Sequence, residues 1–272
     1  MDGQEVILDF LKEVNMEKHN FKKKYGQNFL NNDTILEKIV SSFNPTEDGK
    51  ILEVGPGEGA LTKKLIKLGI SVTAFEIDLE LKPKLDKIIS DNLDIIYGDF
   101  LNINLKDYFK ETENIYVVAN IPYYITTPII TKFIDEKIIP EEMVLMVQKE
   151  VGERLCAKPG NSEYGAITAL LNYYFDIEYL FTVDRSDFYP VPNVDSAIIK
   201  FTKKKQSLSC NEEKYKKIIN DSFKQKRKNI KNNLKNYDLD KISQVLSKYN
   251  FDLTNRAEEL SYEIFVELAN IL

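Results

Sequence analysis

The stretch from Val117 to Tyr124 joins a buried strand to side chains that can hold a planar amine. It begins as a short apolar, β-branched run, which predicts a strand in the interior of a sheet. The strand ends at Asn120-Ile121-Pro122-Tyr123, so an amide, backbone carbonyls and an aromatic ring follow one another at its carboxyl end. Ligands bind at this edge in open α/β sheets.

These groups suit methyl transfer to the exocyclic amine of an adenine. Such an amine is a poor nucleophile because its lone pair is delocalised into the ring, so the nitrogen must pyramidalise before it attacks. The side-chain oxygen of Asn120 and a carbonyl at Ile121 or Pro122 can accept its N–H groups and orient the lone pair. Tyr123 can stack on an extruded base, and Phe188 can cover the opposite face of that base. The alternative is a purely structural loop after a buried strand.

A second motif, Gly55-Pro56-Gly57-Glu58-Gly59, lies between a predicted strand and a predicted helix. Glycines let the backbone approach a ligand closely, and a helix amino terminus favours negative charge. No Lys-Ser/Thr pair follows, so this is not the phosphate loop of a nucleoside triphosphatase. Gly55, Gly57 and Ala60 fit the pattern G-x-G-x-x-A, and Glu76 lies where it can hold a ribose. The loop alone is compatible with both NAD and S-adenosylmethionine, or with a tight structural turn.

Acidic residues end two successive predicted strands. Glu76 can accept hydrogen bonds from both ribose hydroxyls, and Asp99 can accept one from the amino group of a cofactor adenine. Either carboxylate can instead cap the next helix, and Asp78 suits that capping role better than Glu76 does.

The elements that position these residues alternate between strands and helices, which predicts an α/β fold with a doubly wound, mostly parallel sheet. Besides the strand at Val117, strands are predicted at 50–54, 71–76, 93–97, 142–147, 177–183 and 196–202. Helices are predicted at 4–17, 35–43, 60–68, 126–136, 149–155 and 164–175. A further helix should follow the strand 71–76 and end at about residue 89. The connector 185–192 is too short for a helical crossover, so the last two strands should be antiparallel. This Rossmann-like, seven-stranded pattern is typical of methyltransferases that use S-adenosylmethionine.

After Lys205 the strand signals stop, and helices are predicted at about 211–224, 227–236, 239–249 and 260–271. We therefore expect a methyltransferase domain over residues 1–205, with a helical and basic arm at 1–30. A small all-helical domain should occupy residues 206–272, and the family resemblance described below implies that it binds RNA or the ribosome.

Positive charge is concentrated in two places on an otherwise acidic chain. Residues 200–235 hold thirteen Lys or Arg and three Asp or Glu, although the whole chain has a net charge of −6. A second basic cluster occupies residues 18–24. This asymmetry favours a surface that binds a polyanion, and the alternative is a solvated helix face. The residues expected to contact RNA phosphates are Lys22, Lys23, Lys24, Lys203, Lys204, Lys224, Lys226, Arg227, Lys228 and Lys231.

The composition of the 272 residues, 43% hydrophobic and 11% aromatic, is that of a soluble globular protein. No apolar run approaches the length of a membrane span, and the amino terminus is too charged for a signal peptide. Two separated cysteines and one histidine give no metal-binding pattern, so we expect no metal and a cytoplasmic setting.

Four segments in this order resemble the ribosomal RNA adenine N6,N6-dimethyltransferases: Lys24–Leu30, Leu52–Gly59, Asn120–Tyr123 and Asp187–Ser196. The resemblance extends from about residue 18 to residue 260. It implies that Asn28, Leu30, Gly55, Glu76, Asp99 and Asn120 contact S-adenosylmethionine. We expect Gln27, Gly57, Ile77 and Phe100 to line the same site.

Two branches share this core. One modifies two adjacent adenosines near the 3′ end of small-subunit RNA, and the other confers macrolide resistance by modifying large-subunit RNA. Phe223–Asn229 and Arg256–Ser261 resemble the first branch, although Lys226 stands where the family usually has Arg and Tyr124 where asparagine is common. The expected partner is therefore the small ribosomal subunit with its 16S-type RNA, bound by a monomer.

Two other classes remain open at this point. An NAD-linked oxidoreductase is allowed by the glycine loop, but it does not explain Asn120-Ile121-Pro122-Tyr123. A non-catalytic assembly or transcription factor could retain the same fold.

Overall fold

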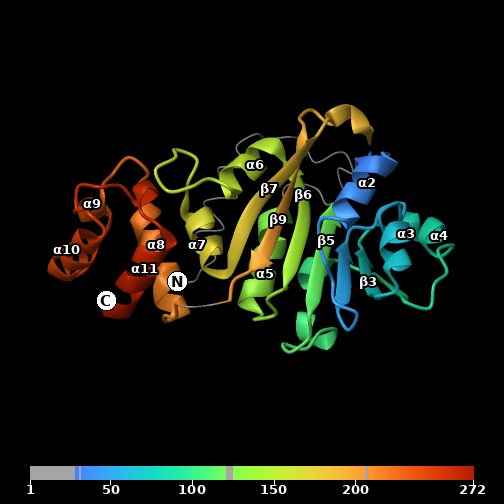
Figure 1. Cartoon of the computed structure of the whole chain (residues 1–272), viewed down its shortest axis with the longest axis horizontal. Coiled ribbons are helices and arrows are strands. Elements are labelled where there is room, and N and C mark those ends of the chain that lie inside the picture. The colour runs from blue at the N-terminus through green and yellow to red at the C-terminus, as the bar shows by residue number, and fades with distance from the viewer. Residues whose placement is uncertain (1–27, 31, 121–124, 206–207) are drawn as a thin grey trace. The chain divides into compact units, whose positions relative to one another are not determined.

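The computed structural model describes residues 28–30, 32–120, 125–205 and 208–272 (Figure 1). Contacts divide the chain into two compact units. The sheet unit runs up to Gly152 and includes Ile177–Lys203, and the helical unit comprises Glu153–Asp176 and Lys204–Leu272. The predicted arm up to residue 27 lies outside the described residues, as do residues 121–124.

A seven-stranded sheet forms the framework of the sheet unit, with strand order β4-β3-β2-β5-β6-β9-β7. The strands are β2 (Lys50–Val54), β3 (Ser71–Glu76), β4 (Leu93–Tyr97), β5 (Ile115–Asn120), β6 (Glu142–Gln148), β7 (Phe175–Val183) and β9 (Ser196–Lys203). The pairs β2–β3, β3–β4, β2–β5 and β5–β6 are parallel, whereas β9 is antiparallel to β6. This arrangement confirms the predicted α/β class and its Rossmann-like sheet.

The helices of the sheet unit are α2 (Asp33–Val40), α3 (Thr62–Leu65), α4 (Lys82–Leu85), α5 (Thr126–Asp135) and α6 (Lys149–Leu155). The predicted helix at 60–68 ends in a 3-10 turn closed by Gly69, whose φ of 74° favours glycine. The helix predicted up to residue 89 is shorter, because Asp78 caps a separate turn at Leu79–Leu81 before α4 begins. One apolar core cluster joins α2 and α3 to the sheet, and its residues include Leu36, Ile39, Ile51, Leu65, Val72, Val118, Val144 and Ile198.

A two-stranded antiparallel sheet joins two of the motif segments. β1 (Phe29–Leu30) pairs with β8 (Phe188–Tyr189), and the side-chain amide of Asn32 donates to Asp187 Oδ1 at 2.8 Å. Sequence periodicity did not predict either strand, because two residues are too few to show an alternating pattern.

The helical unit contains α7 (Ala166–Tyr174), α8 (Glu212–Phe223), α9 (Ile230–Asn233), α10 (Leu239–Lys248) and α11 (Tyr262–Ile271). The Tyr215 hydroxyl of α8 donates to the carbonyl of Ala169 in α7 at 2.8 Å, and the rings of Phe223 and Phe265 lie 5.9 Å apart. The helices predicted at 211–224, 239–249 and 260–271 are confirmed, with small shifts at their ends. The helix predicted at 227–236 is only the short α9, because Asn229 caps a new start there.

The sequence analysis assigned the segment of α7 to the methyltransferase domain, residues 1–205. In the structure, the contacts of this segment group it with the carboxyl-terminal helices. The domain boundary after Lys205 remains a prediction. Among the helices of the described residues, none is both long and apolar enough to cross a bilayer.

We predict that Gly152→Ala destabilises the protein. A Cβ at Gly152 in α6 would lie 2.8 Å from Ala197 Cβ on β9, so the helix would have to move away from the sheet. Such overpacking costs about 1–3 kcal/mol, more than the roughly 1 kcal/mol that alanine gains over glycine within a helix. Urea unfolding of both forms measures the difference.

The matched control is Gly98→Ala, because a Cβ at Gly98 meets no atom within 4 Å. This control should leave the free energy of unfolding within about 0.5 kcal/mol of the wild type. A Gly152→Ala variant as stable as the wild type would contradict the close packing of α6 on β9.

Candidate active site

The carboxyl ends of β2 and β5 lie side by side at the point where the strand order reverses. Their register pairs Val54 with Ala119, so Gly55 and Asn120 are the next residues on two neighbouring strands. Adjacent strands are about 4.8 Å apart, which brings the glycine loop and Asn120 to one place. Open α/β sheets bind their ligands at this switch point.

Three glycines give the loop after β2 its shape. The φ angles of Gly55, Gly57 and Gly59 are 73°, 60° and 79°, in the left-handed region that side chains rarely occupy. The N–H of Gly55 donates to the carbonyl of Phe75 at 2.9 Å, which ties the loop to β3. A Cβ at Gly57 would lie only 3.2 Å from the ring of Phe29 in β1. The motif therefore requires glycine for both conformation and close approach.

Glu76 holds the same loop from the end of β3. Its carboxylate accepts from the N–H of Gly57 at 3.0 Å and from the N–H of Asp78 at 2.8 Å, and the residue is only 1% exposed. Burial raises the pKa of Glu76. An ionised carboxylate has about four acceptor positions, so both oxygens retain capacity for the hydroxyls of a ribose.

Asp78 and Asp99 both have capping roles in the structure. Asp78 accepts from the N–H of Glu80 at 3.0 Å, as the sequence favoured. Asp99 accepts from the N–H of Leu101 at 2.9 Å and from the side-chain amide of Asn102 at 2.8 Å. A role of Asp99 toward the adenine of a cofactor remains a prediction.

The two apolar residues predicted to line the site differ in exposure. Ile77 is 41% exposed and offers apolar surface directly after Glu76. Phe100 is buried, with its ring 5.4 Å from that of Phe75 and 5.8 Å from that of Phe133. Phe100 therefore contributes mainly to the core that supports the end of β4.

Glu53 is a buried acid near the loop that sequence reasoning did not single out. It lies on β2, is 1% exposed, and accepts a 2.6 Å hydrogen bond from the hydroxyl of Thr62 in α3. This bond joins the two elements that flank the glycine loop. Burial raises the pKa of Glu53 to about 7. Its position as the one acidic residue within the predicted strand Lys50–Val54 could have indicated that it is buried.

The pairing of β1 with β8 brings two of the remaining predicted site residues together, because Leu30 lies opposite Phe188. Asn28 is half-buried, whereas Leu30 and Phe188 are buried in the core cluster of the sheet unit. A stacking role of Phe188 remains a prediction. Ile121, Pro122 and Tyr123 lie outside the described residues, as do Gln27, Lys22, Lys23 and Lys24.

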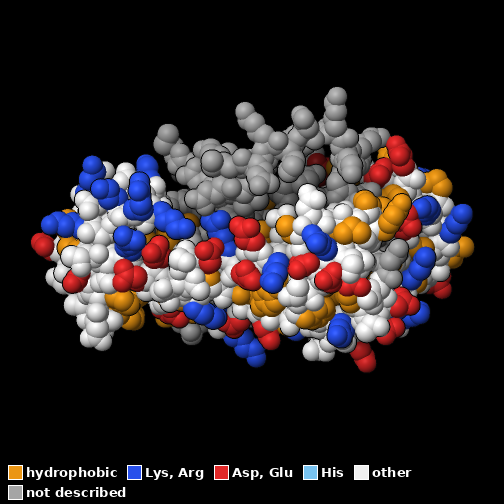
Figure 2. All heavy atoms as spheres, turned by 90° about the horizontal axis from the view of Figure 1, so that it is seen from above, with side chains coloured by type: hydrophobic (Ala, Val, Ile, Leu, Met, Phe, Trp, Pro, Cys, Tyr) orange, Lys and Arg blue, Asp and Glu red, His pale blue; other side chains and the backbone are white. Residues whose placement is uncertain are grey.

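The predicted RNA-binding residues fall into two groups. Lys203 forms an ion pair with Glu141 at 2.6 Å, and Lys204 forms one with Asp176 at 3.4 Å, so both are engaged within the protein. Lys224, Lys226, Arg227, Lys228 and Lys231 are exposed, and no ion pair joins them to a carboxylate in the part of the chain that is described. Figure 2 shows Lys and Arg side chains gathered where Figure 1 places α8, α9 and α10.

The fold and the site together define a Rossmann-like α/β methyltransferase. The family described as ribosomal RNA adenine dimethylase matches residues 18–272. A ribosomal RNA small subunit methyltransferase A from Fusobacterium nucleatum is 46% identical over 258 residues, 92% of this chain and 97% of that protein. The protein of that name from Bacillus cytotoxicus is 40% identical over 267 residues, 93% of this chain and 91% of that protein.

Solved structures agree with this assignment. A dimethyladenosine transferase from Plasmodium falciparum is 28% identical with a TM-score of 0.75, covering 88% of this chain and 95% of that chain. A 23S ribosomal RNA methyltransferase is 26% identical with a TM-score of 0.68, and the match covers 89% of this chain and 99% of that chain. The chain belongs to the ribosomal RNA adenine dimethylase family. It is an S-adenosylmethionine-dependent methyltransferase, which removes the NAD-linked alternative.

The raised pKa of Glu53 predicts a pH dependence of stability. The folded chain keeps Glu53 protonated up to about pH 7, whereas the unfolded chain ionises it from the usual pKa of 4.5. The native state thus binds more protons between these values, so stability falls as pH rises through them, by on the order of 3 kcal/mol.

The Glu53→Gln variant should lack this component, because an amide does not titrate and still accepts from Thr62. Between about pH 5 and about pH 8, the free energy of unfolding in urea should fall less for Glu53→Gln than for the wild type. Asp94→Asn, at an exposed position on β4, is the control, and its free energy of unfolding should fall as much as that of the wild type. Equal falls for Glu53→Gln and the wild type would contradict a protonated Glu53.

Proposed function

We propose that the protein transfers methyl groups from S-adenosylmethionine to N6 of two adjacent adenosines near the 3′ end of small-subunit ribosomal RNA. The observation that carries this proposal is the register of β2 and β5, which sets Asn120 beside the glycine loop. A target amine held at Asn120 would therefore lie next to a nucleoside cofactor held at Glu76.

The residues of the cofactor site fit S-adenosylmethionine, which supplies an electrophilic methyl group when it is bound. Glu76 would accept the ribose hydroxyls with the capacity left beside its two N–H donors. Gly55 and Gly57 let the loop backbone approach the ligand, and Ile77 offers an apolar surface for its base. Asn28, Leu30 and Asp99 complete the proposed contacts.

Asn120 would act on the target base. Its side-chain oxygen would accept one N–H of the adenine amine and direct the nitrogen lone pair toward the methyl group. Carbonyls at Ile121 or Pro122 would accept the other N–H, and Tyr123 with Phe188 would stack on the base. Positioning of this kind replaces a strong general base.

The small subunit is the proposed target because the relatives at 40% and 46% identity carry the name of small-subunit enzymes. The similar 23S ribosomal RNA methyltransferase is 26% identical, so the large-subunit alternative has weaker support. We propose that a cytoplasmic monomer carries out this reaction. Its helical domain from residue 206 would bind RNA through the exposed basic side chains of Lys224, Lys226, Arg227, Lys228 and Lys231.

Methylation of isolated subunits separates the two branches. With labelled S-adenosylmethionine, purified small subunits from cells lacking the enzyme should accept label, and large subunits should not. Digestion of the labelled RNA should yield dimethyladenosine. Label in the large subunit alone would favour the macrolide-resistance branch, and label in neither would favour a non-catalytic assembly factor.

Asn120→Ala should lower single-turnover methylation of small subunits by about 10²–10³-fold, or roughly 3–4 kcal/mol, the range for loss of one preorganised hydrogen-bonding group. Binding of S-adenosylmethionine, measured by calorimetry, should largely survive. Asn114→Ala is the matched control, because Asn114 precedes the opposite end of β5 and should leave turnover near normal. Near-normal turnover by Asn120→Ala would remove Asn120 from the chemistry.

A further inference from the structure

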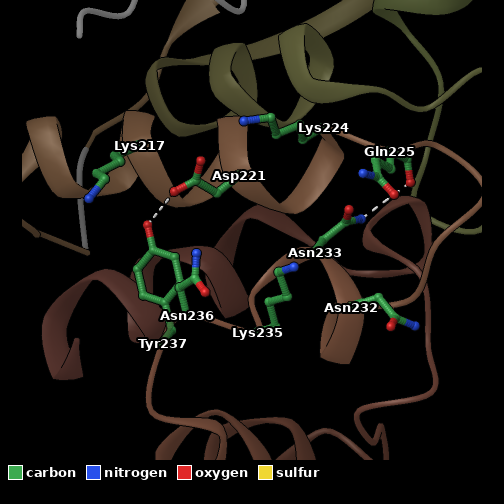
Figure 3. A pocket seen from close by; sticks show the side chains of 9 residues that line it. All are labelled: Lys217, Asp221, Lys224, Gln225, Asn232, Asn233, Lys235, Asn236 and Tyr237. Carbon is green, nitrogen blue, oxygen red and sulfur yellow. Dashed lines mark hydrogen bonds between the residues drawn. The ribbon is translucent and has the colours of Figure 1, made fainter.

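A polar pocket of about 410 Å³ opens in the helical unit between α8, the segment after it, and α9 with the turn that follows (Figure 3). Its volume lies in the usual range for sites that enclose small ligands. Three lysines, four side-chain amides, one carboxylate and one tyrosine line it: Lys217, Asp221, Lys224, Gln225, Asn232, Asn233, Lys235, Asn236 and Tyr237.

Hydrogen bonds within the protein hold two walls of the pocket. The Tyr237 hydroxyl donates to Asp221 Oδ2, joining the turn after α9 to α8. The side-chain amide of Asn233 donates to the carbonyl of Ser222 at 2.6 Å and to those of Gln225 and Lys228 at 3.3 Å. The pocket is therefore preformed, so the protein loses little conformational entropy when a ligand binds.

The lysines leave the pocket with unbalanced positive charge. Lys224 and Lys235 are exposed, and within the described ranges neither forms an ion pair with a carboxylate. The ammonium of Lys217 lies 5.6 Å from the centre of the Tyr237 ring. Asp221, the single acid of the lining, is already bonded to Tyr237. An anionic group such as a phosphate would be attracted to this positive charge.

The other lining groups match the edge of a nucleobase better than a bare anion. Side chains of Gln225 and Asn236 carry both donors and acceptors, as base edges do. The side-chain amide of Asn232 already donates to Asn229 Oδ1 at 2.6 Å. Asp221 Oδ1 remains able to accept a hydrogen bond from an amino group. The exocyclic amine of cytosine lies at one end of the base edge and can donate to this acceptor. The only donor on the edge of uracil, its N3–H, lies between two carbonyl oxygens that the carboxylate would repel.

The chain around the pocket suits a nucleic-acid strand. Exposed Lys226, Arg227 and Lys228 lie between Gln225 and Asn232 in sequence, directly beside lining residues. They can hold the phosphates on either side of a nucleotide that enters the pocket. Single-stranded RNA offers unstacked bases for such recognition, whereas a duplex does not.

We propose that this pocket binds one unstacked nucleotide of single-stranded ribosomal RNA, with its phosphate at Lys224 and Lys235 and its base edge at the amides and Asp221. The site would recognise an amino-bearing base, and it is separate from Asn120, where methyl transfer would occur. The proposal rests on the proposed function only in taking ribosomal RNA as the partner.

Binding of short labelled oligonucleotides tests the pocket directly. The probes are fluorescein-labelled oligocytidine and oligouridine of about ten nucleotides, within the length that single-strand sites cover. Fluorescence anisotropy gives the Kd at several salt concentrations. The double variant Lys224→Gln/Lys235→Gln should weaken oligocytidine binding about tenfold or more. The magnitude of the slope of log K against log salt should fall by about 1.4, because each phosphate contact to a single strand contributes about 0.7.

Two comparisons make this test specific. Lys241→Gln removes one positive charge from α10, away from the pocket lining, and should change the Kd less than about twofold. The wild type should bind oligocytidine more tightly than oligouridine, because only cytosine offers an amine to Asp221. Asp221→Asn should abolish this preference.

Either of two results would overturn the proposal: a double variant that binds RNA as Lys241→Gln does, or equal affinity of the wild type for both oligonucleotides. Normal RNA binding by the double variant, together with weakened binding to intact small subunits, would instead indicate a ribosomal protein at the pocket. If RNA enters the pocket but no subunit is methylated, the proposed function fails and this inference stands.

Discussion

The hydrogen bond from the N–H of Gly57 to the carboxylate of Glu76 connects the glycine loop to the end of β3. A second buried acid, Glu53, connects β2 to α3 through Thr62, so the loop is held from both of its ends. Burying two carboxylates in one region is unfavourable, and their raised pKa values reflect that burial. In the proposed site, a bound ribose would therefore meet a preorganised acceptor.

The order of the strands turns this local arrangement into an active site. Because the sheet winds outward in both directions from β2 and β5, the residues after these two strands meet at one edge. The glycine loop would hold the methyl donor, and Asn120 would hold the amine that accepts the methyl group. Their adjacency requires no further element, and it explains why the same edge can serve both ligands.

The sequence predicted those features that produce a local pattern. Short segments rich in apolar and β-branched residues identified the strands, and the strand-glycine-helix order identified the loop around Gly57. The pairing of Phe29 with Tyr189 was not predictable, because it joins distant two-residue segments with no periodicity. Nor were the ion pairs of Lys203 and Lys204, since partners such as Glu141 and Asp176 are set by tertiary structure. The polar pocket near Lys235 was missed for the same reason, as its lining comes from several segments.

In the proposed function the two units have different roles: the sheet edge would carry out the chemistry, and the exposed basic helices would bind RNA. The most direct measurement is primer extension on small-subunit RNA from cells that lack this protein. The two adjacent adenosines near the 3′ end should then lose the block that dimethylation imposes. The block should return with the wild-type protein or Asn114→Ala, but not with Asn120→Ala. Persistence of the block in cells lacking the protein would contradict the assigned reaction.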